Sequence, residues 1–204
     1  KLSSQLDSPV YGVNTGFGSL ARVRIDPSQS SLLSWNLIRS HAAGVGPIAP
    51  IDITRATMLL RANALSKGVS GCRPVLVETL LQMLNLNLTP VIPLQGSCGS
   101  SGDLAPLAHL GLAMIGDPMG ETWWKGERVN ALKGMRSAGI SPLQPKEKDG
   151  LAITNGAQLS TAIASLNCHD AIALINAGEM AAAMSIEALR GVSRAFHPEV
   201  HLLR

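Results

Sequence analysis

Residues 96–109 read GSCGSSGDLAPLAH, a polar loop of glycines, serines and a cysteine that runs directly into a helix-forming segment. Free backbone N–H groups at a helix N-terminus attract phosphate. The P-loop pattern, however, needs a Lys-Ser/Thr pair, whereas this loop ends in Asp103, whose charge repels phosphate. The serine-hydrolase pattern G-x-S-x-G fails as well, because Gly102 comes one residue too soon. The loop therefore matches neither of these two site types.

The backbone of this loop offers a third kind of chemistry. In a tight bend, the amide nitrogen of Gly102 can approach the carbonyl carbon of Ser100 and close a five-membered ring, because glycine has no Cβ to block the bend. Loss of water gives an imidazolone, and loss of a second water from the Ser101 side chain leaves an exocyclic methylidene. The product would be a strong electrophile made from protein alone.

The loop resembles the signature of the aromatic amino acid ammonia-lyases and related aminomutases, which build a methylidene-imidazolone (MIO) group from Ala-Ser-Gly. Four further blocks are similar to family motifs in the family's order: YGVNTGFG (11–18), SHAAGVG (40–46), LLRANALSKGVSG (59–71) and GLAITNGAQ (150–158). Ser100 replaces the usual alanine. Cyclisation consumes only its backbone carbonyl, so serine should be tolerated there.

The resemblance implies MIO precursors at Ser100, Ser101 and Gly102, and catalytic roles for Tyr11, Ser101 and Asn155. Tyr11 would be the acid/base, which requires nearby positive charge or donors. Asn155 would stabilise negative charge as it develops. Taken alone, Tyr11 is more typical of a half-buried packing residue than of a catalytic one, and Asn155 is typical of a helix C-cap. Asp103 could cap the following helix, orient the loop for cyclisation, or do both.

Ser40 and His41 are the candidate substrate-binding residues. At these two positions the chain resembles the histidine-specific lyases, whereas the tyrosine and phenylalanine enzymes tend to carry His-Leu and Phe-Leu. A neutral imidazole can hydrogen-bond a substrate imidazole. The resemblance thus implies elimination of ammonia from L-histidine to give trans-urocanate. The alternatives are a tyrosine or phenylalanine lyase or aminomutase, and a non-catalytic binding module that lacks the ring.

Composition limits the partners. Apolar residues make up 46% of the chain and charged residues 15%, and the net charge of +3 is scattered, which disfavours nucleic acid. Cys72, Cys98 and Cys168 lack CxxC spacing, so we expect neither a disulfide framework nor a metal site, and a reducing cytoplasm fits best. No leader or membrane span is expected. The resemblance adds that no diffusible cofactor is needed.

The element pattern predicts a mainly α-helical fold, with a short hairpin around Lys125–Gly126 and long glycine-rich active-site loops. Helices are expected over 28–41, 53–66 (capped by Asp52), 74–86, 103–115 and 151–191, the last interrupted at Asn155–Gly156 and more weakly at Gly178, with a surface linker over 140–150.

We expect residues 1–204 to form one domain, the MIO-bearing N-terminal part of a longer ammonia-lyase, with 150–204 beginning its central helical bundle. The family's carboxylate-binding arginine falls beyond Arg204. Family members are tetramers whose sites combine several subunits, so the resemblance implies a homotetramer at full length. The 204 residues alone are expected to be inactive.

Overall fold

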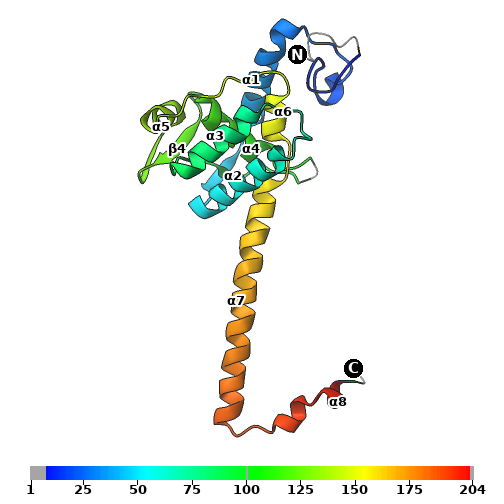
Figure 1. Cartoon of the computed structure of the whole chain (residues 1–204), viewed down its shortest axis with the longest axis vertical. Helices are drawn as coiled ribbons and strands as arrows, with labels where there is room; N and C mark the ends of the chain where they lie inside the picture. Colours follow the sequence, from blue (N-terminus) through cyan, green and yellow to red (C-terminus); the bar gives the residue numbers. More distant parts are fainter. Residues whose placement is uncertain (1–7, 100, 203–204) are drawn as a thin grey trace. The chain divides into compact units, whose positions relative to one another are not determined.

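The computed structural model describes residues 8–99 and 101–202 (Figure 1). The chain divides into two compact units, Lys1–Ile163 and Ala164–Arg204. The long helix α7 (Gln158–Ala188) begins in the first unit and continues into the second. All of the predicted site residues belong to the first unit, so the fold of that unit determines their geometry.

Helices form the core of the first unit, which confirms the mainly α-helical prediction. α4 (Leu104–Ile115) is the central helix, and ten of its twelve residues are buried. Contacts join α4 to α1, α5 and α6, and α2 packs on α3. The bounds of these elements are α1 Ser30–His41, α2 Ile51–Ser66, α3 Pro74–Asn85, α5 Ala131–Ser137 and α6 Asp149–Thr154, with 3-10 turns η1 Gly18–Leu20 and η2 Pro27–Gln29.

Two small antiparallel sheets flank these helices. β1 (Val45–Ile48) pairs with β3 (Pro93–Gln95), and the second sheet has the order β2-β4-β5. Its strands are β2 Thr89–Pro90, β4 Glu121–Trp124 and β5 Glu127–Asn130. The predicted hairpin is confirmed, and Lys125 and Gly126 both adopt the positive φ that a two-residue turn requires. The other strands were not predicted because they are short and contain proline, which weakens any strand pattern.

Two expectations about the ends and connections of the helices are wrong, and a third, about α7, follows below. Asp52 does not cap α2, because the helix begins at Ile51 with Pro50 in the cap position. The segment 140–150 is not a free surface linker, since Leu143 and Asp149 are buried within it. Serine hydroxyls of α1 donate to backbone carbonyls of this segment, Ser31 to Pro145 and Ser34 to Lys146. Its polar composition therefore serves packing against α1.

The predicted break at Asn155–Gly156 is confirmed, because α6 ends at Thr154 and α7 starts at Gln158. The weaker interruption expected at Gly178 is wrong, since α7 continues through it. Beyond α7, the second unit contains η3 (Ser193–Phe196) and α8 (Pro198–His201).

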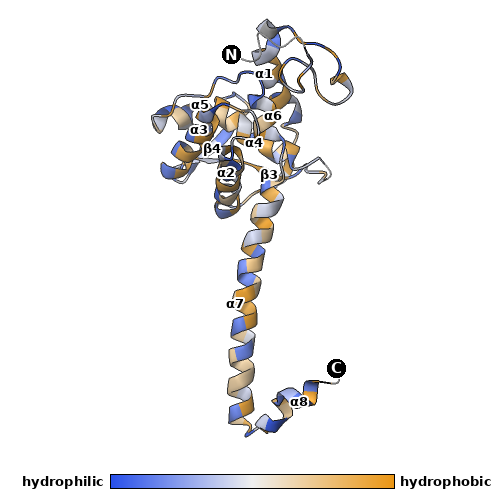
Figure 2. Cartoon of the chain, turned by 45° about the vertical axis from the view of Figure 1, so that its right-hand side comes forward, coloured by the Kyte–Doolittle hydropathy of each residue, from blue (hydrophilic) through white to orange (hydrophobic). Residues whose placement is uncertain are grey.

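Apolar residues occur along the length of α7 (Figure 2). Many of them are exposed. They include Ile172, Leu174, Ile175, Met180 and Met184. By length and composition, the stretch 149–188 is apolar enough to cross a membrane. A core helix of a soluble bundle meets the same criterion, and two glutamates, Glu179 and Glu187, lie within this helix.

Candidate active site

Asp103 anchors the loop that carries the proposed ring precursors. Its side chain is buried, with 1% exposed, and its carboxylate accepts hydrogen bonds from the Ser97 hydroxyl at 2.7 Å and from the Ser160 backbone N–H at 2.8 Å and hydroxyl at 2.7 Å. Asp103 occupies the cap position of α4 but makes no side-chain capping bond there. Its carboxylate therefore ties the loop to the start of α7 instead of capping α4.

The loop itself closes in a tight turn. The Gly102 N–H donates to the Gly99 carbonyl at 3.2 Å, and both glycines have positive φ, 78° at Gly99 and 92° at Gly102. The Ser101 side chain is exposed on this turn. Ser100, the remaining predicted precursor, lies outside the described residues. A bent backbone with glycine at its end is what cyclisation requires, so the described residues fit the ring.

The Asn155–Gly156 turn packs directly against this loop. The Asp103 N–H donates to the Gly156 carbonyl at 2.6 Å. A Cβ at Gly102 would collide with that same carbonyl oxygen, so only glycine permits the approach. Two motifs more than fifty residues apart in the sequence are thereby brought into contact. The Asn155 side chain is exposed beside them, and Asn155 is the C-cap of α6 in an extended conformation.

Tyr11 lies in the N-terminal loop and has 44% of its surface exposed. Its hydroxyl accepts a hydrogen bond from the Gly18 N–H at 3.3 Å, and its ring meets Phe17 edge to face. The Lys148 ammonium lies 5.8 Å from the ring centroid and donates to the Tyr11 carbonyl at 3.0 Å. Tyr11 therefore has a cation beside its ring and a backbone donor at its hydroxyl.

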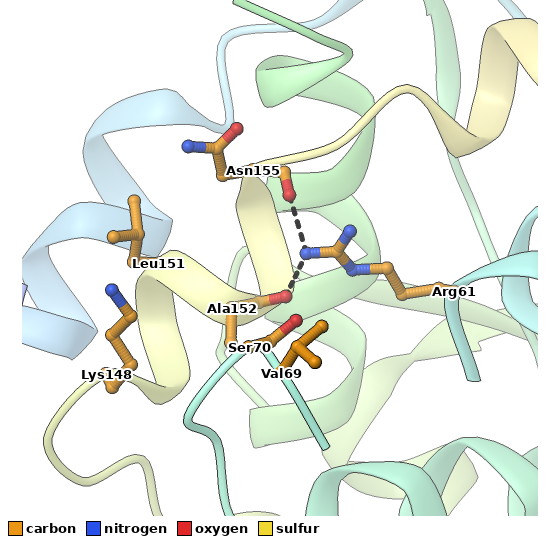
Figure 3. A pocket seen from close by; sticks show the side chains of 7 residues that line it. All are labelled: Arg61, Val69, Ser70, Lys148, Leu151, Ala152 and Asn155. Atoms are coloured by element: carbon orange, nitrogen blue, oxygen red, sulfur yellow. Dashed lines mark hydrogen bonds between the residues drawn. The ribbon is translucent and has the colours of Figure 1, made fainter. Parts of the chain in front are cut away.

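A pocket of about 220 Å³ lies beside Asn155, with walls from α2, α6 and the segment after α2 (Figure 3). The Arg61 guanidinium extends toward α6 and donates to the backbone carbonyls of Ala152 and Asn155, while the Asn155 carboxamide points away from it. Burial lowers the pKa of Arg61 to about 10. Arg61 therefore remains a cation at neutral pH. The lining residues are Arg61, Val69, Ser70, Lys148, Leu151, Ala152 and Asn155.

His41 is the last residue of α1 and lines a second pocket, of about 300 Å³, together with Phe17, Leu33 and Leu37. Its Nδ1 lies 2.9 Å from the Leu37 carbonyl oxygen and 3.0 Å from the Ser40 hydroxyl. The Ser40 hydroxyl also bonds the Leu37 carbonyl at 3.0 Å, so Ser40 faces its own helix.

The structure thus arranges the predicted residues in two groups. Gly102 and Asp103 contact the Asn155–Gly156 turn. Tyr11 contacts one lining residue of each pocket, Lys148 in the first and Phe17 in the second. Among the described residues, no hydrogen bond joins Tyr11 or His41 to the ring-forming loop.

Sequence reasoning missed the residues that hold this arrangement, chiefly Arg61, Lys148 and Ser160. A signal for Arg61 was present, because it shares the buried face of α2 with Met58 and Leu65, where a charged side chain is unusual without partners. Lys148 and Ser160 carried no comparable local pattern. Their contacts to Tyr11 and Asp103 join distant segments of the chain.

The chain belongs to the aromatic amino acid lyase family, whose model matches residues 2–204. Histidine ammonia-lyase of Geobacillus sp. (strain WCH70) is 50% identical over 195 residues, which cover 96% of this chain and 38% of that relative. Histidine ammonia-lyase of Bacillus subtilis (strain 168) is 48% identical over 198 residues, covering 97% and 39%. The chain thus spans about two fifths of the length of the curated relatives it matches.

Solved structures show the same fold. Histidine ammonia-lyase from Trypanosoma cruzi matches with a TM-score of 0.86 and 38% identity over 97% of this chain and 38% of its own. A tyrosine aminomutase matches with a TM-score of 0.88 and 38% identity, covering 98% and 38%. Phenylalanine aminomutase from Pantoea agglomerans has a TM-score of 0.89 and 32% identity, covering 97% and 38%. The fold is therefore shared by lyases and aminomutases.

Proposed function

We propose that the full-length protein is an ammonia-lyase that converts L-histidine to trans-urocanate, using a ring formed from Ser100, Ser101 and Gly102. The observation that carries this proposal is the tight Gly99–Gly102 turn, anchored by buried Asp103 against the Asn155–Gly156 turn. The relatives of this chain named histidine ammonia-lyase, at about half identity, support the same substrate.

Ring formation needs no external oxidant. The Gly102 nitrogen bonds to the Ser100 carbonyl carbon, and that oxygen leaves as water with the amide hydrogens of Ser101 and Gly102. A second water takes the Ser101 hydroxyl and its Cα hydrogen, which leaves the methylidene. The finished MIO group supplies an electrophile that activates the substrate amine for departure.

Tyr11 is the proposed base for the substrate β-proton. Its ring lies beside the Lys148 ammonium, and its hydroxyl accepts from the Gly18 N–H, so a phenolate there would have both a cation and a donor nearby. The Asn155 side chain points away from Arg61 and is free to donate toward developing negative charge. In this proposal Tyr11 takes the proton, and Asn155 stabilises the negative charge that develops.

His41 is proposed to recognise the imidazole ring of the substrate, and Ser40 is proposed to orient the His41 side chain. When Nδ1 carries the proton, it donates to the Leu37 carbonyl and leaves Nε2 as an acceptor. An imidazole N–H of L-histidine can donate to Nε2, whereas a phenylalanine ring offers no such donor. Because the Ser40 hydroxyl points back to the helix, its role is to help orient the His41 ring.

The full-length protein is proposed to be a cytoplasmic homotetramer. The three cysteines, Cys72, Cys98 and Cys168, are all free, which suits a reducing compartment. The exposed apolar side chains of α7 need cover from further helices of the same chain or of other subunits. A site completed by other segments would also explain why Tyr11 is exposed and His41 only half-buried in this part of the chain.

Substrate preference of the full-length enzyme tests this proposal. We expect the highest kcat/KM on L-histidine among L-histidine, L-tyrosine and L-phenylalanine. His41→Leu should erode this preference by about 10-fold or more, since an unsatisfied hydrogen-bonding group costs about 1 to 3 kcal/mol. His41→Gln, which keeps an acceptor, is the matched control and should lose less. Equal or better kcat/KM on either other amino acid would contradict the substrate assignment and leave the ammonia-lyase chemistry standing.

A further inference from the structure

We propose that Arg61 is a positioning residue for ring formation, because its guanidinium holds the Asn155–Gly156 turn against Gly102. The inference rests on the proposed function and concerns the same site. Arg61 does not touch Ser101 in the described structure, so it would act through the turn and not as a catalytic residue.

The contacts of Arg61 converge on the end of α6. Nη2 donates to the Ala152 carbonyl and, at 2.8 Å, to the Asn155 carbonyl, and Nη1 donates to the Gln158 side chain at 2.8 Å. The last carbonyls of a helix lack partners within it and carry partial negative charge. A guanidinium with several donors in a fixed plane satisfies them together. Arg61 thereby spans the break between α6 and α7.

Steric contacts continue the path from Arg61 to the ring precursor. A Cβ at Gly156 would collide with Nη1 of Arg61, and a Cβ at Gly102 would collide with the Gly156 carbonyl. The same carbonyl accepts the Asp103 N–H at 2.6 Å. Displacement of the guanidinium would therefore loosen the surface against which Gly102 is bent.

The burial of Arg61 is costly, which argues that its contacts matter. Only 4% of the residue is exposed, and its Nε has no hydrogen-bond partner among the described residues. Burying an unpaired polar atom is unfavourable. An apolar residue on this face, like its neighbours Met58 and Leu65, would avoid that cost. A cation at this position gains hydrogen bonds to the three acceptors around the α6–α7 break, which an apolar residue could not make.

A second contact holds the other end of α6 independently of Arg61. At the other end of this helix, Arg73 Nε donates to buried Asp149 at 2.7 Å and joins α6 to the start of α3. That ion pair holds the N-terminal end of α6, at the opposite end of the helix from the Asn155–Gly156 turn. Arg61 is the clamp that reaches the turn.

The test measures ring formation apart from turnover. Full-length protein is made by cell-free synthesis, and intact mass is followed over time for the loss of two waters. Arg61→Ala should slow this loss by about 10- to 100-fold, because misplacement by about 1 Å can cost about 100-fold in an intramolecular reaction. Millimolar guanidinium should restore part of the rate, whereas urea at the same concentration should not.

Arg55→Gln is the matched control. Arg55 lies on the same helix and also donates to a backbone carbonyl, that of Leu84 at 3.1 Å, but this contact is to α3. The Arg55→Gln variant should therefore lose the two waters at the wild-type rate. If Arg61→Ala fails to fold, two milder variants replace it in the test. Gln158→Leu removes only one of the three acceptors, and Arg61→Lys keeps the positive charge. Both variants should fold, and both should lose the two waters more slowly than wild type.

The outcomes separate the two claims. A wild type that loses both waters, with Arg61→Ala maturing equally fast, would overturn the role of Arg61 alone. The same holds if Gln158→Leu and Arg61→Lys both mature at the wild-type rate. A wild type that retains both waters would overturn the proposed function, and this inference with it.

Discussion

The two halves of the candidate site are held in different ways. On the ring-forming side, the anchors are buried side chains, Asp103 at 1% and Arg61 at 4% exposure. Arg61 makes three hydrogen bonds to a distant segment, and Asp103 accepts two from distant Ser160 and one from Ser97 within its own loop. On the substrate side, Tyr11 is 44% exposed and Ser40 lies at the surface. The proposed ring formation would therefore depend on contacts inside this part of the chain, and the proposed substrate recognition on groups that remain open to further partners.

This difference follows from what each half must do. An uncatalysed cyclisation within the backbone needs a loop that is bent before reaction, and buried hydrogen bonds provide that order. A substrate pocket has to admit and release a ligand, so its residues stay accessible until binding. The comparison predicts that changes on the substrate side reduce rate without loss of stability, and that changes at the anchors reduce both.

The largest effect on the substrate side is expected for Tyr11→Phe. Removal of a general base typically costs about 100- to 10,000-fold in rate, so kcat of the full-length enzyme should fall by that order with little change in KM. The free energy of unfolding should stay close to wild type, because the hydroxyl makes only an exposed hydrogen bond to Gly18. Steady-state kinetics and urea unfolding measure the two quantities.

A change confined to KM would show that Tyr11 binds substrate and does not transfer a proton. Lys148→Met is a useful companion variant. It removes the cation beside the Tyr11 ring and leaves the phenol in place. Its effect on kcat should be smaller than that of Tyr11→Phe.

A smaller effect in free energy is expected for Asp103→Ala, and it should appear in stability as well as in ring formation. The carboxylate accepts from Ser97 and Ser160, and hydrogen bonds to a charged group contribute about 1.5 to 3 kcal/mol each. In urea unfolding, the free energy of unfolding of full-length Asp103→Ala should fall by at least the contribution of one such hydrogen bond. Its intact mass should show a larger fraction of molecules that have lost no water than in wild type.

Asp26→Ala is the control for this variant. Asp26 also accepts from a serine, Ser28, but it does so at the exposed surface. Asp26→Ala should unfold at the wild-type urea concentration and should lose two waters relative to its own encoded mass, as wild type does. Equal stability of Asp103→Ala and wild type would contradict the distinction between anchored and open halves.

Local patterns in the sequence were sufficient for the helices α1 to α4, α6 and α7, for the Lys125–Gly126 hairpin and for the break at Asn155–Gly156, but not for the short helices α5 and α8. These features depend on residues within a few positions of one another, such as glycine at positive φ in a turn. The resemblance of five sequence blocks to family motifs supplied the residues proposed to act in catalysis. Neither source could supply the contacts that order them.

Those contacts are long-range in sequence. Asp103 and Ser160 are 57 residues apart, and Lys148 and Tyr11 are 137 apart. Local propensity carries no information about such pairs, and the polar composition of 140–150 even suggested a free linker. Arg61 is the one anchor whose position on a buried helical face gave a readable signal.

The central claim is that this chain carries a ring-forming loop, and the intact mass of the full-length protein tests it most directly. Wild type should be lighter than its encoded sequence by two waters, and peptide mapping should place the loss at residues 100–102. Ser101→Ala has no hydroxyl to eliminate and cannot form the methylidene, so it should lose at most one water relative to its own encoded mass and should lose nearly all turnover. Its fold should be unchanged, because the Ser101 side chain is exposed. A wild type with the full encoded mass, or full activity in Ser101→Ala, would contradict the account.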